Sequence, residues 1–258
     1  IESAEITLPI EENISKLGYT FAGWFDNEEL TGSKITSIPA KSTGDKTFYA
    51  KWETITYSIT YQLNGGNWVE NYNAPSGFTI ESEAITLPTA ENISKLGYTF
   101  AGWFEDESFS GSKITSIPAK STGDKKFYAK WETITYSITY QLNGGNWAEN
   151  YNAPSGFTIE SAEITLPIEE NISKLGYTFA GWFDNESLSG EAVLSINPSA
   201  DKLAENKTFY AKWTENEYTI TYDLSDSEDV VSGVKVSADN SANPITKFTI
   251  SSSVIELN

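Results

Sequence analysis

The stretch Gly97-Tyr98-Thr99-Phe100-Ala101-Gly102-Trp103-Phe104 decides how the chain is organised, because the same eight residues recur before and after it. The other two copies span residues 18–25 and 176–183, so the copies follow one another at intervals of 79 residues. This period is too long for the rungs of a solenoid and suits small domains that each have a core of their own. The 258-residue chain is therefore a tandem array of modules of about 79 residues.

Local patterning predicts that each module is built from strands. Residues 57–63 (Tyr-Ser-Ile-Thr-Tyr-Gln-Leu) alternate between aromatic or aliphatic side chains on one face and small polar ones on the other. Asn64-Gly65-Gly66 ends this strand with residues that allow the positive φ angles of a tight turn. Residues 126–131 alternate in the same way, and further extended stretches are expected within 78–87 and 97–104.

Helix signals are weak by comparison. Residues 91–96 can form about one turn before Gly97, and residues 114–118 are the other candidate, limited by Pro118. We therefore expect a β-rich α+β fold, in which each module is a small, mostly antiparallel sheet covered on one face by a short helix or an irregular crossover. Because the links between modules are too short for flexible tethers, we expect the array to be an elongated, fairly stiff rod.

The repeat divides the chain into four parts. Residues 1–53 form a partial repeat that lacks its first strand, and residues 54–132 form a complete repeat. Residues 133–214 form a second complete repeat, with a three-residue insertion ahead of its last strand. Residues 215–258 form a diverged partial repeat or a C-terminal cap.

The residue types that are missing exclude much chemistry. The chain has no Cys, His or Met, and its 17 basic residues are all Lys. Without Cys and His it lacks a thiol nucleophile, an imidazole base and the usual transition-metal ligands, and a formal net charge of −19 repels nucleic acids. We predict a non-enzymatic protein without a cofactor and without a nucleic-acid partner. Because no apolar run is long enough for a spanning helix, direct membrane insertion is not expected.

Four motifs that recur in a fixed order give the chain a resemblance to a known family. Besides the eight-residue motif, they are Thr-Gly-Asp-Lys (43–46 and 122–125), Phe-Tyr-Ala-Lys-Trp (48–52, 127–131 and 209–213) and Tyr-Gln-Leu-Asn-Gly-Gly (61–66 and 140–145). The pattern resembles the Listeria–Bacteroides repeat, a family that includes the B-repeats of internalin B. The resemblance implies ubiquitin-like β-grasp modules in secreted or wall-attached bacterial proteins, where they serve as stalks or spacers without catalytic residues.

The functional prediction follows from this resemblance: an extracellular array on a bacterial cell surface, acting as a stalk, spacer or fibre segment whose partners are neighbouring repeats. Two alternatives stay open, an adhesive module that binds a host protein or glycan and a self-assembling filament subunit. In the filament, the partial repeats would complement each other head to tail between copies of the chain. The strands expected to do so contain Tyr218, Ile220, Tyr222, Phe248, Ile250 and Ile255. The favoured explanation of the partial repeats is a chain that was cut, or a repeat unit that is circularly permuted, at this phase of the repeat.

The chain has eight Trp residues, five of which we consider as possible binding surfaces because aromatic rings can stack on a ligand. Trp52 and its copies Trp131 and Trp213 lie on the apolar side of an alternating strand and are expected in the core. Trp68 and Trp147 follow the Gly-Gly turn, and we expect them to be exposed. They are the candidates for contact with a neighbouring module or, as the less favoured alternative, with a ligand.

Acidic clusters follow each copy of the eight-residue motif, at 26–29, 105–107 and 184–186, and another lies at 226–229. A Ca²⁺ loop needs six to eight oxygen ligands at defined spacing, usually with a glycine turn. None of the clusters that follow the motif has that order. We expect solvated loops there and predict no metal site.

Overall fold

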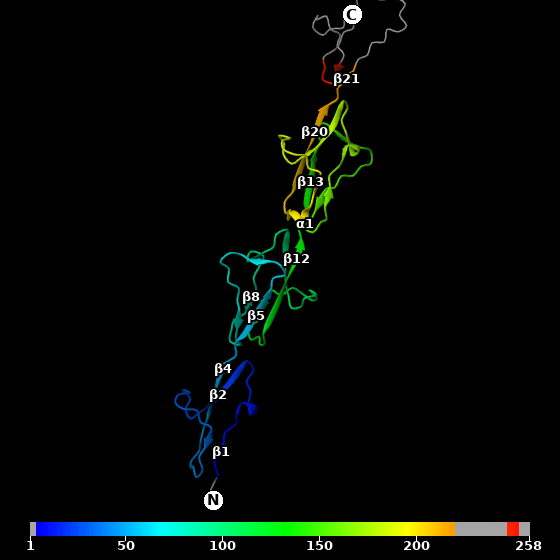
Figure 1. Cartoon of the computed structure of the whole chain (residues 1–258). Coiled ribbons are helices and arrows are strands. Elements are labelled where there is room, and N and C mark those ends of the chain that lie inside the picture. Colours follow the sequence, from blue (N-terminus) through cyan, green and yellow to red (C-terminus); the bar gives the residue numbers. More distant parts are fainter. Residues whose placement is uncertain (1–3, 220–246, 253–258) are drawn as a thin grey trace, which may run out of the picture. The chain divides into compact units, whose positions relative to one another are not determined.

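The computed structural model describes residues 4–219 and 247–252 and divides into two compact units, residues 1–132 and 133–258. Each unit contains one complete repeat, and strands far outnumber helices in both (Figure 1). The prediction of a β-rich array of repeats is confirmed.

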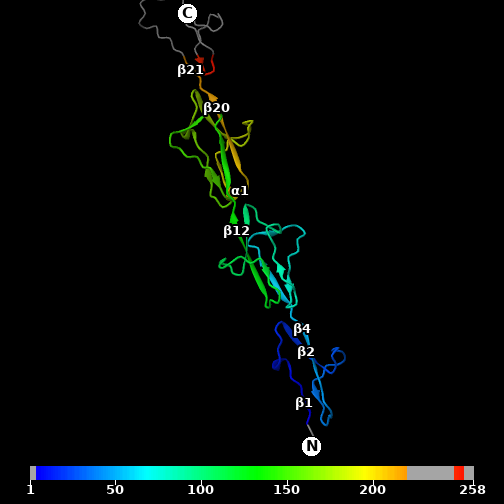
Figure 2. The same ribbon diagram turned by 180° about the vertical axis from the view of Figure 1, so that it is seen from behind.

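The first repeat contributes a two-stranded antiparallel ladder between its longest strands, which lie side by side from the front and from behind (Figures 1 and 2). The register shifts between Phe21 and Gly23, which marks a β-bulge. A second short pair lies near the N-terminus. The elements are β1 (Ile6–Thr7), the 3₁₀-helix η1 (Glu11–Asn13), β2 (Tyr19–Phe25), β3 (Ser37–Ile38) and β4 (Tyr49–Thr54).

The second repeat, which is complete, forms a four-stranded sheet in the order β10-β12-β5-β7. Its strands are β5 (Tyr57–Gln62), β6 (Asn67–Trp68), β7 (Gly77–Phe78), β8 (Ile85–Thr86), β9 (Ile93–Ser94), β10 (Tyr98–Phe104), β11 (Ser116–Ile117) and β12 (Lys125–Thr133). The first and last strands meet at the centre and pair in parallel, with Ile59 opposite Lys125 and Tyr61 opposite Phe127. The other pairs for which a direction is resolved are antiparallel.

The third repeat has the same sheet, in the order β15-β13-β20-β18, with β13 and β20 parallel. Its elements are β13 (Tyr136–Gln141), β14 (Asn146–Trp147), β15 (Gly156–Phe157), β16 (Ile164–Thr165), η2 (Glu169–Asn171), β17 (Ile172–Ser173), β18 (Tyr177–Phe183), β19 (Ser195–Ile196), α1 (Pro198–Asp201) and β20 (Lys207–Glu215). The short helix α1 falls within the part of the sequence that carries the three-residue insertion, and the side chain of Asn197 caps it. The diverged part of the chain adds β21 (Tyr218–Thr219) and β22 (Lys247–Phe248), which pair antiparallel.

Both predicted helices in the second repeat are wrong. Residues 90–92 form a turn that leads into β9, and residues 116–117 form β11, which pairs with β8. The apolar residues of these segments reach the core from extended backbone, so the long-range pairing overrides the weak local helix preference. In the second repeat the connection is irregular, whereas the first and third repeats contain the short helices η1, η2 and α1, so both predicted kinds of connection occur. The ubiquitin-like β-grasp itself stays a prediction.

The core of each complete repeat consists of its own residues. In the second repeat, the alternation predicted for residues 57–63 and 126–131 places Ile59, Phe127 and Ala129 inside, all less than 7% exposed. Trp131 and Trp213 pack against the two cores as half-buried side chains, as predicted. The buried residues are Ile59, Phe78, Leu87, Ile93, Trp103, Ile117, Phe127 and Ala129 in the second repeat and Ile138, Phe157, Leu166, Ile172, Trp182, Ile196, Phe209 and Ala211 in the third.

Candidate functional site

The contact between consecutive repeats is built by the same backbone bond in both places where the structure describes it. In the first unit, Ile55 follows the last strand of the first repeat and donates its amide to the carbonyl of Gly18, 2.9 Å away. In the second unit, the amide of Asn216 donates to the carbonyl of Gly176, also at 2.9 Å. Each linker is thus fixed to the repeat that precedes it.

A glycine of the preceding repeat forms a seat for an isoleucine of the following one. Gly18 is buried and has a φ of +79°, and a Cβ added to it would lie 2.7 Å from the Cβ of Ile80. Gly176 has the same φ, and its added Cβ would lie 2.7 Å from the Cβ of Ile250. Both the left-handed backbone and the close approach of the isoleucine therefore require glycine.

The tyrosine next to each seat adds a polar contact. The Tyr19 hydroxyl donates a hydrogen bond of 2.8 Å to Oε1 of Glu81, which lies in a turn of the following repeat. This bond to a carboxylate stabilises the protonated phenol and raises the pKa of Tyr19. The ammonium of Lys16 lies over the Tyr19 ring, 3.9 Å from its centre, so the tyrosine contacts a cation through its ring and an anion through its hydroxyl.

The equivalent tyrosine in the second unit has a different carboxylate partner. The Tyr177 hydroxyl donates to Oε1 of Glu215, 3.1 Å away at the end of β20. The hydroxyl of Ser251, in the turn of the following repeat, donates to the same oxygen. Hydrogen bonds from Ser251, Thr249 and Tyr177 lower the pKa of Glu215 because they stabilise its charged form.

The predicted contact residues Trp68 and Trp147 lie elsewhere. Trp68 is half-buried, and its ring centre lies 5.3 Å from that of Tyr61 and 6.0 Å from that of Trp103, within its own repeat. Trp147 packs in the same way on Tyr140 and Trp182. Their predicted exposure is corrected, because the turn at Gly65-Gly66 folds β6 back over the module's own core. That they contact a ligand or another module stays a prediction.

The packing around these tryptophans buries a hydroxyl group. The Tyr61 hydroxyl is buried without a hydrogen-bond partner among the described residues, and the Tyr140 hydroxyl is in the same position in the third repeat. Burial raises the pKa of Tyr61 to about 12, since the phenolate would lose its hydration, and it also raises the pKa of Tyr140. An unpaired buried hydroxyl costs roughly 1–3 kcal/mol of stability.

We therefore expect Tyr61→Phe to raise the free energy of unfolding of the second repeat by about 1 kcal/mol, measured by denaturant unfolding at pH 7. The folded repeat holds the Tyr61 proton more tightly than the unfolded chain does. The resulting stability is present below pH 10 and is lost as the pH rises toward about 12. Tyr61→Phe should reduce this alkaline loss. A lower stability of the variant at pH 7 would contradict the assignment. Half-buried Tyr57→Phe serves as the control within the same strand.

The structure describes three of the six residues predicted to act in head-to-tail assembly. Tyr218 and Phe248 pair with each other across β21 and β22, with ring centres 5.4 Å apart, as Tyr57 and Phe78 do in the second repeat. Ile250 lies against Gly176 of the preceding repeat. The remaining three, Ile220, Tyr222 and Ile255, lie outside the described residues.

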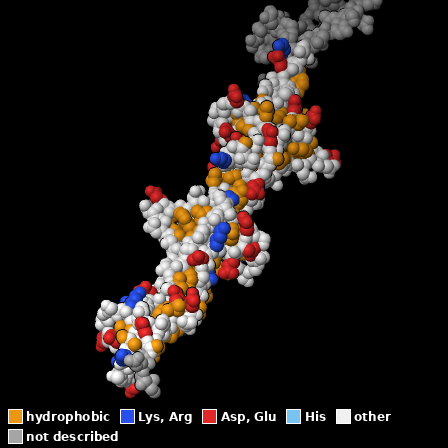
Figure 3. Space-filling model, turned by 60° about the horizontal axis from the view of Figure 1, so that its bottom comes forward, with side chains coloured by type: hydrophobic (Ala, Val, Ile, Leu, Met, Phe, Trp, Pro, Cys, Tyr) orange, Lys and Arg blue, Asp and Glu red, His pale blue; other side chains and the backbone are white. Residues whose placement is uncertain are grey.

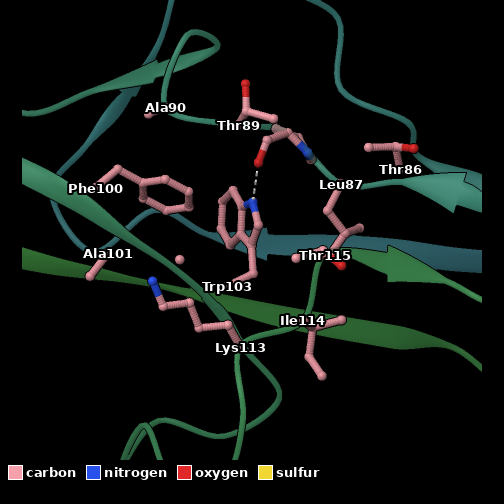
Figure 4. A pocket seen from close by; sticks show the side chains of 12 residues that line it. Thr86, Leu87, Thr89, Ala90, Phe100, Ala101, Trp103, Lys113, Ile114 and Thr115 are labelled. Carbon is pink, nitrogen blue, oxygen red and sulfur yellow. Dashed lines mark hydrogen bonds between the residues drawn. The ribbon is translucent and has the colours of Figure 1, made fainter.

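A groove lies beside the tryptophan of the eight-residue motif. In the second repeat it has a volume of about 260 Å³, and Trp103 closes its floor with an indole N–H that donates to the carbonyl of Pro88 at 2.7 Å (Figure 4). The stem of Lys113 crosses Gly102, and Phe100 flanks the indole. A groove of about 140 Å³ lies at the same place in the first repeat. The lining is mainly apolar and holds no acid–base pair.

In the loops that hold the acidic clusters, one side chain accepts hydrogen bonds from the amides of its own loop. The carboxylate of Asp106 accepts hydrogen bonds from the hydroxyls of Ser108 and Ser110 and from their amides, which lowers its pKa to about 2. In the other repeats Asn27 and Asn185 occupy this position and accept the equivalent amide bonds. Within residues 4–219 and 247–252, no three acidic side chains gather as metal ligands, and the cluster at 226–229 lies outside these ranges.

Sequence reasoning missed the isoleucine seat. Gly18 and Gly176 open the eight-residue motif, and Phe-Thr-Ile recurs at 78–80, 157–159 and 248–250, so both halves of the contact are visible as repeats. Nothing local indicates that they meet, because they are separated by 62 residues in the first unit. Among the described residues, no helix has the length and apolar character needed to cross a membrane.

Comparisons with known proteins agree with this organisation. The chain is 34% identical over 225 residues to a protein of Evansella cellulosilytica named provisionally as a membrane protein, covering 86% of this chain and 31% of the relative. It is 26% identical over 221 residues to Internalin H of Listeria monocytogenes, covering 83% of this chain and 33% of that protein. The chain thus spans about a third of the length of these relatives. No solved structure matches it.

A model of one protein family matches most of the chain. The Listeria-Bacteroides repeat domain is found three times, at residues 2–51, 57–130 and 136–212. These segments coincide with the first repeat and the two complete ones, whose shared sheet and shared linker contacts are described above. The chain belongs to the Listeria–Bacteroides repeat family.

Proposed function

We propose that the chain is a non-enzymatic stalk or spacer segment of a bacterial surface protein. The observation that carries this proposal is the linker bond, which recurs between Ile55 and Gly18 and between Asn216 and Gly176. A linker of a few residues that is bonded to one repeat and enters the first strand of the next has little freedom to bend. Repeats joined in this way suit a part whose task is to hold other domains at a distance.

The relatives support the surface location of this proposal. Internalin H and the two provisionally named membrane proteins of Evansella cellulosilytica, the second of them glycine-rich and 30% identical over 237 residues, are all longer than this chain. A repeat segment that makes up a quarter to a third of such proteins fits a connecting role between other parts. Extracellular placement of this chain is part of the proposal.

The surface charge fits a solvated spacer. The chain carries 36 acidic and 17 basic residues, and the acidic side chains are scattered over the visible face without forming one patch (Figure 3). A net negative charge keeps neighbouring proteins apart and maintains solubility. No described buried residue is polar or charged, so the charge lies on the surface and leaves the cores apolar.

Small-angle X-ray scattering tests the proposal directly. A compact chain of 258 residues has a radius of gyration of about 18 Å, and an unfolded one about 56 Å. We expect roughly 30–45 Å with a scattering profile of stiff, folded modules, because the linkers keep consecutive repeats from folding back on each other. A value near 18 Å, or a profile that shows freely jointed modules, would contradict the spacer.

The adhesive alternative has its own test. A glycan array and a pull-down with the chain would show specific retention if Trp68 and Trp147 contact a ligand, and Trp68→Ala with Trp147→Ala would abolish it. Because both rings also pack on their own cores, folding of these variants must be checked by circular dichroism.

A further inference from the structure

The two described contacts between repeats share one backbone geometry but place their acidic residue differently. The register pairs Tyr19 with Thr54 in the first repeat and Tyr177 with Glu215 in the third, so Thr54 and Glu215 occupy the same position. Structure and sequence therefore align the two linkers without ambiguity. The linker position is neutral in one contact and acidic in the other.

The turn that the following repeat contributes is also the same in both places. The amide of Thr79 donates to the hydroxyl of Ser82 at 3.0 Å, and the amide of Thr249 donates to the hydroxyl of Ser252 at 2.9 Å. Between these residues the sequence is Ile80-Glu81 in one turn and Ile250-Ser251 in the other. The acid has moved from the turn to the linker, and the serine has taken its place.

Each tyrosine keeps one carboxylate partner despite this exchange. Tyr19 donates to Glu81 of the following repeat, and Tyr177 donates to Glu215 of the linker. A tyrosine hydroxyl has a single proton and can donate to only one acceptor at a time. If both the linker and the turn carried a carboxylate, one of the two would lack the tyrosine as a hydrogen-bond donor and would be repelled by the other.

Among the described residues, one lysine lies over each tyrosine ring, and the other cation beside the second contact, Lys247, is already paired with Glu217. Lys16 lies over the Tyr19 ring at 3.9 Å, and Lys174 lies over the Tyr177 ring at 4.3 Å. One ammonium can balance one carboxylate, whereas two carboxylates and one ammonium would leave a net negative charge at a contact in an already acidic chain.

We propose that the linker position and the turn position form an exclusive pair, in which the tyrosine receives its carboxylate from one side of the contact and never from both. A repeat that ends in Thr, like Thr54, then accepts a successor whose turn reads Phe-Thr-Ile-Glu. A repeat that ends in Glu215 accepts a successor whose turn reads Phe-Thr-Ile-Ser. The pair rests on the proposed function, and it sets which repeat can follow which.

The order of repeats in this chain agrees with this proposed exclusive pair. The linker residue Thr133 is followed by a repeat with Glu160 in its turn, the same combination as Thr54 with Glu81. Only the repeat that precedes the diverged part carries the linker acid, and only the diverged part carries the turn serine. The diverged part is thus matched to its predecessor and mismatched to a Thr-ending repeat, which would leave the tyrosine without a carboxylate.

Amide hydrogen exchange in the whole chain tests the pair, because the amide of Asn216 is protected by its bond to Gly176 only while the contact is closed. Ser251→Glu should lower the protection factor of this amide about three- to fivefold, since it sets two carboxylates against one donor. Adding Glu215→Thr, which recreates the combination of the first contact, should restore the protection to within about twofold. Ser251→Gln, similar in size but neutral, should leave it unchanged.

The amide of Ile138, which donates to Ser155 inside the third repeat, serves as the internal reference and should keep its protection in every variant. In about 1 M salt the effect of Ser251→Glu should shrink, because the charges are screened. Unchanged protection in Ser251→Glu, or no recovery in the double variant, would overturn the pair while leaving the spacer intact. An Asn216 amide that exchanges freely in the unmodified chain would overturn the ordered contact itself and the spacer with it.

Discussion

Gly18→Ala is expected to open the contact between the first and second repeats. The added methyl group would lie 2.7 Å from Ile80, and overpacking of this kind costs roughly 1–3 kcal/mol. The left-handed backbone at a φ of +79° costs a further roughly 1–2 kcal/mol for any residue with a Cβ, but this cost falls on the first repeat whether the contact is open or closed, so only the overpacking acts on the contact. Protection of the Ile55 amide, which bonds to Gly18, should therefore fall by at least about fivefold and by up to about 150-fold.

A second glycine of the same repeat provides the matched control. Gly44 also has a φ of +79°, but a Cβ added there meets no atom within 4 Å. Gly44→Ala should thus show the backbone cost alone and leave the Ile55 amide protected. Ile80→Ala should partly restore protection in the Gly18→Ala background, because it removes the side chain that the methyl group meets. Equal effects of Gly18→Ala and Gly44→Ala on Ile55 would refute the seat.

Trp103→Ala is expected to destabilise the second repeat strongly and to spare the third. Trp103 is 1% exposed, lies 5.0 Å from Tyr61 between ring centres and donates its indole N–H to Pro88. Truncating a buried tryptophan costs about 3–5 kcal/mol. A repeat of about 79 residues has about 4–12 kcal/mol in total at 0.05–0.15 kcal/mol per residue, so this loss removes between about a quarter and all of its stability.

The identical architecture of the third repeat supplies the mirror experiment. Trp182 is also 1% exposed and occupies the same place in a core made only of residues of that repeat. Trp103→Ala should strongly lower the protection of the Ile59 amide and leave that of Ile138 unchanged, whereas Trp182→Ala should do the reverse. If both amides lost protection together in either variant, the cores would not be independent.

The candidate contact was only partly predictable from sequence. The sequence shows that Gly18 and Ile80 each belong to a repeated motif. A glycine at a turn, however, can be required for either of two reasons, a positive φ angle or a close neighbour. Only the folded chain shows that both apply at this glycine, whereas the φ angle alone applies at Gly44. The sequence also does not show that the carboxylate partner of the tyrosine can come from either side of the contact. This becomes clear only when the strand register aligns Thr54 with Glu215.

The burial of Trp68 shows why local pattern was insufficient for the candidate site. Its position after a Gly-Gly turn is compatible with either an exposed loop or a strand folded back on the core. Pairing of β6 with β9 decides for the second, with Trp68 opposite Ile93. That pairing joins segments far apart in the sequence, whose attraction no window of neighbouring residues reports.

The sequence by itself determined the tandem organisation, the family, the strands of residues 57–63 and 126–131 and the face of each that is buried. These features follow from periodicities of two residues and of 79 residues, which are properties of the chain alone. Tertiary structure decided the parallel pairing of β5 with β12, the extended crossover where helices were predicted, and the seat that joins one repeat to the next. Each of these depends on contacts between distant segments, whose free energy exceeds the small local preferences that sequence windows measure.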